Sequence, residues 1–285
     1  MTAMRKIGFG LAACALLAAG CAGRNRTPVL PPLPVAKDLD LGDVEKQLRL
    51  TQMRLVSLKL DATARFVSPT VSATDICRAK IIFLRHASGN KLRLMVRKPT
   101  GGRLIDAGCD GEQIWVYEPT KSLAQRGRAN AYYDPEGSLG IFPDDLAEIF
   151  ALWSVFETRL RIFEVSFPAY HIQLIDVGKS ENIQLLRRIA IQRSDLSVVG
   201  YQIFNPDNSL RAVFWMGEHK NHQGVSVPHR IRVAWPAARS ILDMQVNYVE
   251  VNVPIEADAF LMPAGKKVTV AELTGSELLP RGRRR

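Results

Sequence analysis

The sequence predicts an α+β fold in which a single long antiparallel sheet curls beneath covering helices. Residues 57–66 alternate between apolar and polar side chains, as in a strand with one buried face, and residues 91–98 show the same alternation. Turn signals separate such runs along the chain. Residues 41–55 and 143–153 instead carry apolar residues at helical spacing. Ten or more strands with two helical segments favour one large sheet, which must curl or split.

The chain begins with the three parts of a secretory signal. Arg5 and Lys6 form a positive start, residues 7–19 form a short apolar run, and small residues close it. This run would span only about 20 Å as a helix, which is short of the ~30 Å core of a bilayer. We therefore predict that residues 1–20 are a signal peptide and not a transmembrane helix.

Cys21 directly follows Leu17-Ala-Ala-Gly20, a segment that resembles the lipobox of bacterial lipoproteins. The resemblance implies cleavage between Gly20 and Cys21, a diacylglyceryl group on the thiol and an acyl group on the new amine. Ala18 departs from the family's preference for leucine. An ordinary signal followed by a chance cysteine is the alternative. In such lipoproteins an aspartate after the cysteine favours the inner membrane, so Ala22 implies the outer membrane.

Residues 21–40 are predicted to be a lipidated tether, because four prolines fall within residues 27–34 and proline-rich segments run extended. The folded domain would occupy residues 41–272, beginning with an amphipathic helix over residues 41–55. Residues 273–285 form an arginine-rich tail. The net charge is +10, or +8 once Arg5 and Lys6 leave with the signal. The tail is either solvated or in contact with anionic lipid; for an exported chain we expect no nucleic-acid partner.

The strands are predicted in two groups. The first group covers residues 57–66, 79–86, 91–98, 103–107 and 113–118, and the second covers residues 170–176, 185–193, 199–205, 210–218, 225–234 and 240–251. In the first meander, Cys109 would lie across from about Arg93, and Arg93 across from Leu84, which is seven residues from Cys77. That is about 23 Å along a strand, whereas a disulfide needs Cα atoms within about 7 Å. We expect no disulfide, with both cysteines unpaired.

The second helical segment begins at Pro143, where proline and the acidic pair Asp144 and Asp145 suit a helix start. A curled sheet over a helix leaves room for an apolar cavity. The alternative is a filled core. The sequence does not say which face is concave, and the candidate cavity-lining residues are Leu58, Leu60, Leu92, Leu94 and Trp115.

Several motifs, in order, resemble the bacterial lipoprotein-localisation family, the LolA/LolB-like proteins. Residues 109–119 read Cys-Asp-Gly-Glu-Gln-Ile-Trp-Val-Tyr-Glu-Pro, similar to the family's Asp-Gly-x-x-Leu-Trp-x-Tyr-x-Pro strand. Residues 224–231 contain Gly-x-x-x-Pro-x-x-Ile, and residues 252–260 contain Asn, seven residues and Phe. Residues 205–214 resemble the family's hairpin. The similarity covers about residues 44–260.

The resemblance implies an incomplete barrel of about eleven antiparallel strands with helices as a lid. In the two best-known members the cavity holds lipoprotein acyl chains. A lipid-anchored member is more like the receptor than the soluble carrier. The receptor's loop with an exposed leucine is matched here by Lys98-Pro-Thr100-Gly, so its membrane-insertion step does not carry over.

The sequence offers no catalytic motif, cofactor loop or complete metal site. His219 and His222 have no third ligand nearby, and zinc sites need at least three protein ligands, so we interpret this segment as a polar hairpin turn. His229 is interpreted as a surface or rim residue. We expect no enzyme and no cofactor.

The function predicted from the sequence is therefore a periplasm-facing lipoprotein of the outer membrane. It would bind acyl chains or lipoproteins, with a periplasmic carrier protein as a further candidate partner, in lipoprotein sorting or lipid handling. The alternative is a non-catalytic envelope sensor or scaffold that acts through protein–protein contacts.

Overall fold

The computed structural model describes residues 36–69, 76–87, 89–129, 131–133, 141–152, 160–177, 183–263, 268–273 and 275–277. Residues 36–285 form one compact unit, to which the following account is confined. The predictions made for Gly20, Cys21, most of the tether and most of the arginine-rich tail lie outside the described residues.

The main sheet is long and open, and it is antiparallel except at one edge, where β15 runs parallel to β6. Its spatial order is β15 (Thr269–Glu272), β6 (Leu123–Arg128), β5 (Gln113–Glu118), β4 (Arg103–Cys109), β3 (Lys91–Arg97), β2 (Cys77–Leu84), β1 (Ser57–Val67), β14 (Ser240–Val251), β13 (Val225–Trp235), β12 (Leu210–His222), β11 (Val198–Phe204), β10 (Ile183–Gln192), β9 (Ala169–Val177) and β8 (Leu160–Val165). A short pair, β7 (Ala131–Tyr133) and β16 (Gly275–Glu277), lies apart from it.

The sheet therefore has 14 strands among the described residues, where the family resemblance implied about eleven. The sequence analysis missed β6 because its residues, Leu-Ala-Gln-Arg-Gly-Arg, show no apolar alternation. It missed β8 and β15 because neither strand contains a buried residue. It also ended β12 at residue 218, whereas the strand continues to His222 and closes on the two-residue turn Gln223-Gly224.

Strand β1 lies in the middle of the sheet, where it joins the two meanders. Its alternate residues from Leu58 to Phe66 are buried, and it pairs with β2 on one side and β14 on the other. The predicted alternation over residues 57–66 is confirmed. Burial on one face of so long a strand fixes its register, because a slip of one residue would expose the whole apolar set.

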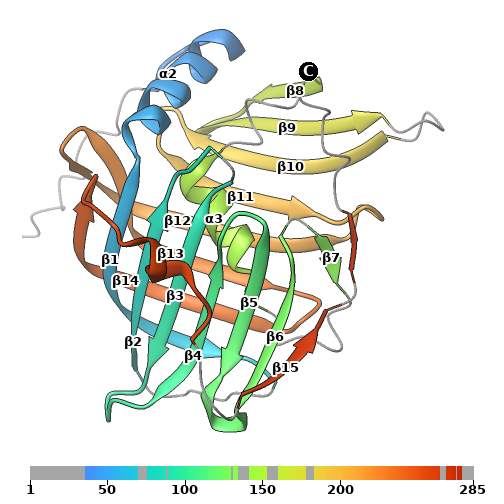
Figure 1. Cartoon of the computed structure of the whole chain (residues 1–285). Helices are drawn as coiled ribbons and strands as arrows, with labels where there is room; N and C mark the ends of the chain where they lie inside the picture. Colours follow the sequence, from blue (N-terminus) through green and yellow to red (C-terminus); the bar gives the residue numbers. More distant parts are fainter. Residues whose placement is uncertain are drawn as a thin grey trace, which may run out of the picture. The chain divides into compact units, whose positions relative to one another are not determined.

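Helix α3 (Pro143–Ala151) shows how far the sheet curls (Figure 1). It packs against β3, β4 and β5 of the first meander. Its acidic side chains also pair with Arg187 on β10 and Arg211 on β12, in the second meander. One nine-residue helix touches both halves only because the sheet wraps around it. The predicted curled sheet is confirmed, and the helices that cover it are few.

Helix α2 (Leu41–Arg54) confirms the predicted first helix, ending one residue before the predicted limit. Asp40 caps its start by accepting a hydrogen bond from the Asp43 amide at 2.8 Å. Val44 and Leu48 are the buried residues of its inner face. The helix thus lies with one apolar stripe against the sheet.

The face of the sheet opposite α3 is partly covered by a short helix, η3 (Ala257–Phe260). The Trp115 indole donates a hydrogen bond to the Phe260 carbonyl at 3.2 Å. It also lies across the backbone of Gly108, where a Cβ atom would stand only 2.5 Å from the ring. The motifs that contain Trp115 and Phe260 therefore meet in one contact on the convex face.

Cys77 and Cys109 are both buried, and they form no disulfide. Cys109 lies across from Leu92, one residue from the predicted Arg93, and Leu92 lies across from Phe83. Phe83 is about 20 Å along β2 from Cys77, so the strand geometry separates the two sulfurs. Burial raises the pKa of the Cys109 thiol to about 12.

Candidate functional site

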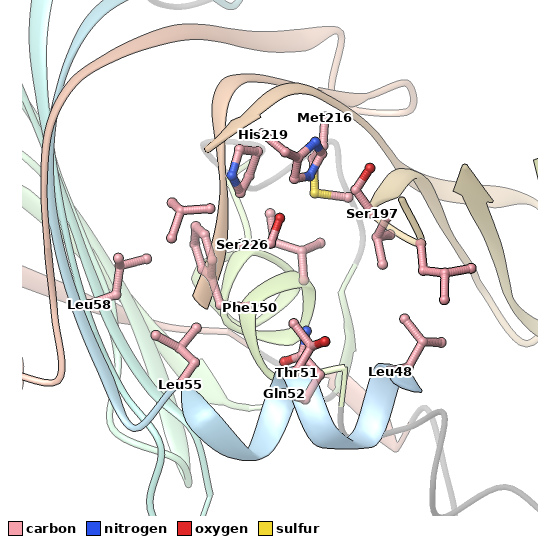
Figure 2. Close-up of a pocket in the computed structure, with 15 residues that line it drawn as sticks. Leu48, Thr51, Gln52, Leu55, Leu58, Phe150, Ser197, Met216, His219 and Ser226 are labelled. Carbon is pink, nitrogen blue, oxygen red and sulfur yellow. The ribbon is translucent and has the colours of Figure 1, made fainter. Parts of the chain in front are cut away.

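A pocket lies between α2 and the concave face of the sheet (Figure 2). The end of α3 and strands β12 and β13 form its floor. Side chains of α2 cover the opposite side. Most of the lining is apolar. The lining residues are Leu48, Thr51, Gln52, Leu55, Leu58, Ile149, Phe150, Leu196, Ser197, Val198, Met216, His219, Ser226, Val227 and Pro228.

The pocket is narrow as the structure stands. Its volume is only about 50 Å³. Small-molecule sites enclose roughly 300–1,000 Å³. The apolar chemistry suits a hydrocarbon chain, but a long chain fits only if α2 moves outward.

The polar groups of the lining stand on two sides of the pocket. Thr51 donates its hydroxyl proton to the Gln47 carbonyl of its own helix, and Ser197 donates to Asp195 at 2.7 Å. Burial lowers the pKa of His219, opposed by the nearby Asp195 carboxylate. Imidazole is therefore neutral here at neutral pH, and the lining of the pocket carries no formal charge.

Next to the pocket, His222 and His229 form a stacked pair with their Nε2 atoms 2.9 Å apart. The Nδ1 atom of His229 lies 3.2 Å from the Val246 carbonyl, so it carries the proton that this bond needs. His229 is buried, which corrects the interpretation of it as a surface or rim residue. His219 and His222 lie on strand β12, and the turn begins only after them.

Inside the curl, α3 is held by buried ion pairs. The Arg187 guanidinium binds Glu148 through two bonds of 2.9 Å, and the Tyr201 hydroxyl donates to the same carboxylate at 2.7 Å. Arg211 binds Asp145 at 3.0 Å and reaches Asp144 at 3.4 Å. These acids are thus more than an acidic helix start, because they tie the helix to the second meander.

One guanidinium faces two buried carboxylates at the start of α3. Burial raises the pKa of Asp145 to about 7, opposed by Arg211 and reinforced by the charge of Asp144. The indole of Trp235 also donates to Asp145 at 3.1 Å. A proton shared in this cluster removes one of the two negative charges, which lowers the cost of burying it.

The structure brings only one of the five predicted lining residues into the pocket. Leu58 lines it. Leu60, Leu92 and Leu94 are buried in the apolar core on the same face of the sheet. Trp115 lies on the opposite, convex face, so its assignment to the cavity is wrong. Alternation places Ile114 and Val116 inward, and Trp115 between them must point outward.

Sequence reasoning missed the arginines that hold α3. Arg187 shares the inward phase of Ile189 and Ile191, so the period of two was a usable signal. For Arg211 the sequence contained no such signal. The register between β11 and β12 shifts between Ile203 and Phe204, and Arg211 is the extra residue of this bulge. A bulge re-aims a side chain in a way that alternation does not reveal.

The described residues hold no group of three or more His, Cys, Asp or Glu side chains arranged to bind a metal ion. Nor does any helix among them have the length and apolarity to cross a membrane. What the site offers chemically is an uncharged, mostly apolar pocket beneath a helix.

No protein-family model matches the sequence, and no curated protein is similar to it. Solved structures do match its fold. A DUF1329 family protein from Desulfovibrio piger superposes with a TM-score of 0.54 at 12% identity, covering 77% of this chain and 95% of that one. A domain named for outer membrane lipoprotein sorting, from Vibrio parahaemolyticus, gives 0.53 at 8% identity over 76% and 94%.

A LolA superfamily protein from Nitrosomonas europaea gives a TM-score of 0.50 at 12% identity, covering 79% of this chain and 99% of the other. These likenesses span nearly the whole of each neighbour, and they agree with the motifs found in the sequence. At such low identity they concern the fold. The curled, open antiparallel sheet and these three neighbours together show that the chain has a LolA-like fold.

Proposed function

We propose that this protein is a non-catalytic, periplasm-facing lipoprotein of the outer membrane that binds an acyl chain of a lipid or lipoprotein between α2 and the concave sheet. The observation that carries the proposal is the apolar pocket beneath a helix. Apolar burial at about 25 cal/mol per Å² would supply the affinity. The named lipoprotein-sorting and LolA-superfamily neighbours support a role in handling lipoproteins.

Binding of a long chain requires α2 to move as a lid, because the closed pocket is too narrow. The helix is attached mainly at its ends. Glu45 accepts a 2.6 Å bond from Arg161 on β8, and Asn252 accepts from the Val56 amide and donates to the Arg54 carbonyl. Between these points the inner face of α2 contributes mainly apolar contacts, which an acyl chain would replace with similar ones. Gln52 also accepts a hydrogen bond from Arg85 at 3.3 Å.

The test uses residues 22–285, which lack the signal and the lipidation cysteine but contain the whole compact unit. Native mass spectrometry and lipid extraction should find co-purified acyl chains, and a fluorescent fatty acid should bind the delipidated protein. Thr51→Trp, which fills the pocket, should abolish binding. Gln47→Trp places the same side chain on the exposed side of α2 and serves as the control.

Absence of both co-purified and added acyl chains would contradict the proposal. The second candidate, an envelope sensor or scaffold, would then be favoured. One observation favours this second candidate: α3 and its buried ion pairs occupy part of the concave side, where a larger ligand would otherwise lie.

A further inference from the structure

The outer face of α2 presents an unusual combination of exposed side chains. At 100° per residue, Lys46, Leu50 and Met53 lie together, directly opposite the buried Val44 and Leu48. Leu50 is 48% exposed and Met53 is 68% exposed. Large apolar side chains in such a position are excluded from the core by the geometry of the helix.

Cations flank this apolar centre. Arg49 and Arg54 are exposed on either side of it, about a quarter turn away, and Lys46 lies in line with it one turn earlier. The acids of α2 are in its first half, where Asp43 stands in the first turn and Glu45 pairs with Arg161. The second half of the helix, residues 46–54, is therefore basic without any acid.

Apolar side chains framed by Lys and Arg on one helical face are the pattern of a helix that lies in a membrane interface. The apolar residues enter the acyl boundary, and the cations remain at the level of the phosphates. Val56, just past the end of the helix, is also 51% exposed. A protein partner would need a matching acidic groove, whereas an anionic leaflet supplies charge and hydrocarbon in the same arrangement.

We propose that the outer face of α2, residues Lys46, Arg49, Leu50, Met53 and Arg54, docks on a membrane leaflet that carries anionic headgroups. The predicted tether fits this placement. Residues 21–40 would reach about 60 Å when extended, which is ample length for the helix to lie on the membrane to which Cys21 is predicted to be anchored. Docking would hold the pocket, on the other side of the same helix, close to the lipid.

This inference goes beyond acyl-chain binding and does not depend on it, because a protein whose pocket stays closed would dock equally well.

The test is co-sedimentation of residues 22–285 with vesicles of phosphatidylcholine, with and without phosphatidylglycerol, at about 0.05 and 0.5 M salt. We expect binding to the anionic vesicles that weakens with salt. Lys46→Gln/Arg54→Gln should weaken binding about 25-fold, since each cation near an anionic surface contributes about fivefold. Leu50→Ser/Met53→Ser should weaken it about tenfold or more.

Matched controls remove the same charge and the same apolar exposure elsewhere. Arg78→Gln/Lys80→Gln changes two exposed cations on β2, and Val177→Ser/Ile183→Ser changes side chains 46% and 64% exposed at the β9–β10 hairpin. Both controls should bind as the parent does. A chain that ends at residue 277 tests the arginine-rich tail, and it should retain most of the binding.

The proposal is overturned if both α2 variants sediment like the parent, or if either control or the shortened chain loses the binding instead. Failure of the acyl-chain proposal gives a different result, because vesicle binding would persist in Thr51→Trp while fatty-acid binding is absent in the parent. Circular dichroism of each variant establishes that the chain is folded.

Discussion

At the scale of single residues, the most consequential side chains are the charged ones inside the curl. Arg211 is buried, and its guanidinium binds Asp145, reaches Asp144 and donates to the Ala131 carbonyl at 2.7 Å. Its Cζ atom also lies 4.5 Å from the centroid of the Phe142 ring. Desolvation of such a group is costly, and only a full set of partners offsets it. The cluster therefore fixes where α3 sits.

Arg211→Met should destabilise the protein by about 3–5 kcal/mol, because it leaves two buried carboxylates without their cation. Urea unfolding near pH 7 measures the change in the free energy of unfolding. Asp145→Asn should cost clearly less, since a carboxyl whose pKa is about 7 is already partly neutral there. Equal losses in the two variants would contradict this account of the cluster.

At the scale of elements, α2 has a buried face toward the pocket and an exposed outer face, and Asn252 holds its end in place. Asn252 follows β14 with a φ of 57°, a left-handed conformation that asparagine tolerates better than most residues. Its amide side chain closes two hydrogen bonds with the end of α2, at 2.9 and 2.8 Å. The asparagine of the family motif thus attaches the helix that covers the pocket.

Asn252→Ala should loosen α2 more than the rest of the domain. Two hydrogen bonds disappear, and alanine is strained at positive φ, so we expect about 1–3 kcal/mol of local destabilisation. Amide hydrogen exchange should accelerate in residues 44–54 and remain slow in β1 and β14. Asn247→Ala removes a bond to the exposed Thr63 hydroxyl and is the control. Exchange that accelerates equally in both variants would show that the Asn252 hydrogen bonds do not hold α2 in place.

At the scale of the whole domain, stability should depend on pH through groups with opposite signs. Burial is the main cause that lowers the pKa values of His219 and His229, and for His229 the charges of Lys220 and His222 add to it while Glu218 opposes it. The unfolded chain therefore takes up these protons first, and stability falls as the pH drops through about 6.5. The raised pKa of Asp145 acts in the other direction, stabilising the fold as the pH drops through about 7.

The histidine contribution is isolated by comparing the parent with His219→Gln/His229→Gln. Between about pH 7.5 and 5.5 the parent should lose stability relative to the variant, because only the parent has His219 and His229 to protonate on unfolding. Urea unfolding at several pH values measures this difference. A parent that gains stability relative to the variant as the pH falls would refute the assigned direction.

Several features of the domain follow from local sequence. The alternation in residues 57–66 predicted a half-buried strand, because side chains in a strand point to opposite faces in turn. The spacing of Val44 and Leu48 predicted α2, and Pro143 with two acids predicted the start of α3. Motifs whose residues sit in hairpin turns or on one strand predicted the LolA-like fold that the structural neighbours share.

The candidate pocket depended on tertiary structure. Which face is concave follows from how the meanders curl about α3, and that rests on contacts between residues far apart in sequence, such as Asp145 with Arg211. For this reason Leu58 reaches the pocket, Leu92 is buried in the core, and Trp115 lies outside. Local periodicity determines which side chains share a face, whereas only long-range packing decides which face encloses a space.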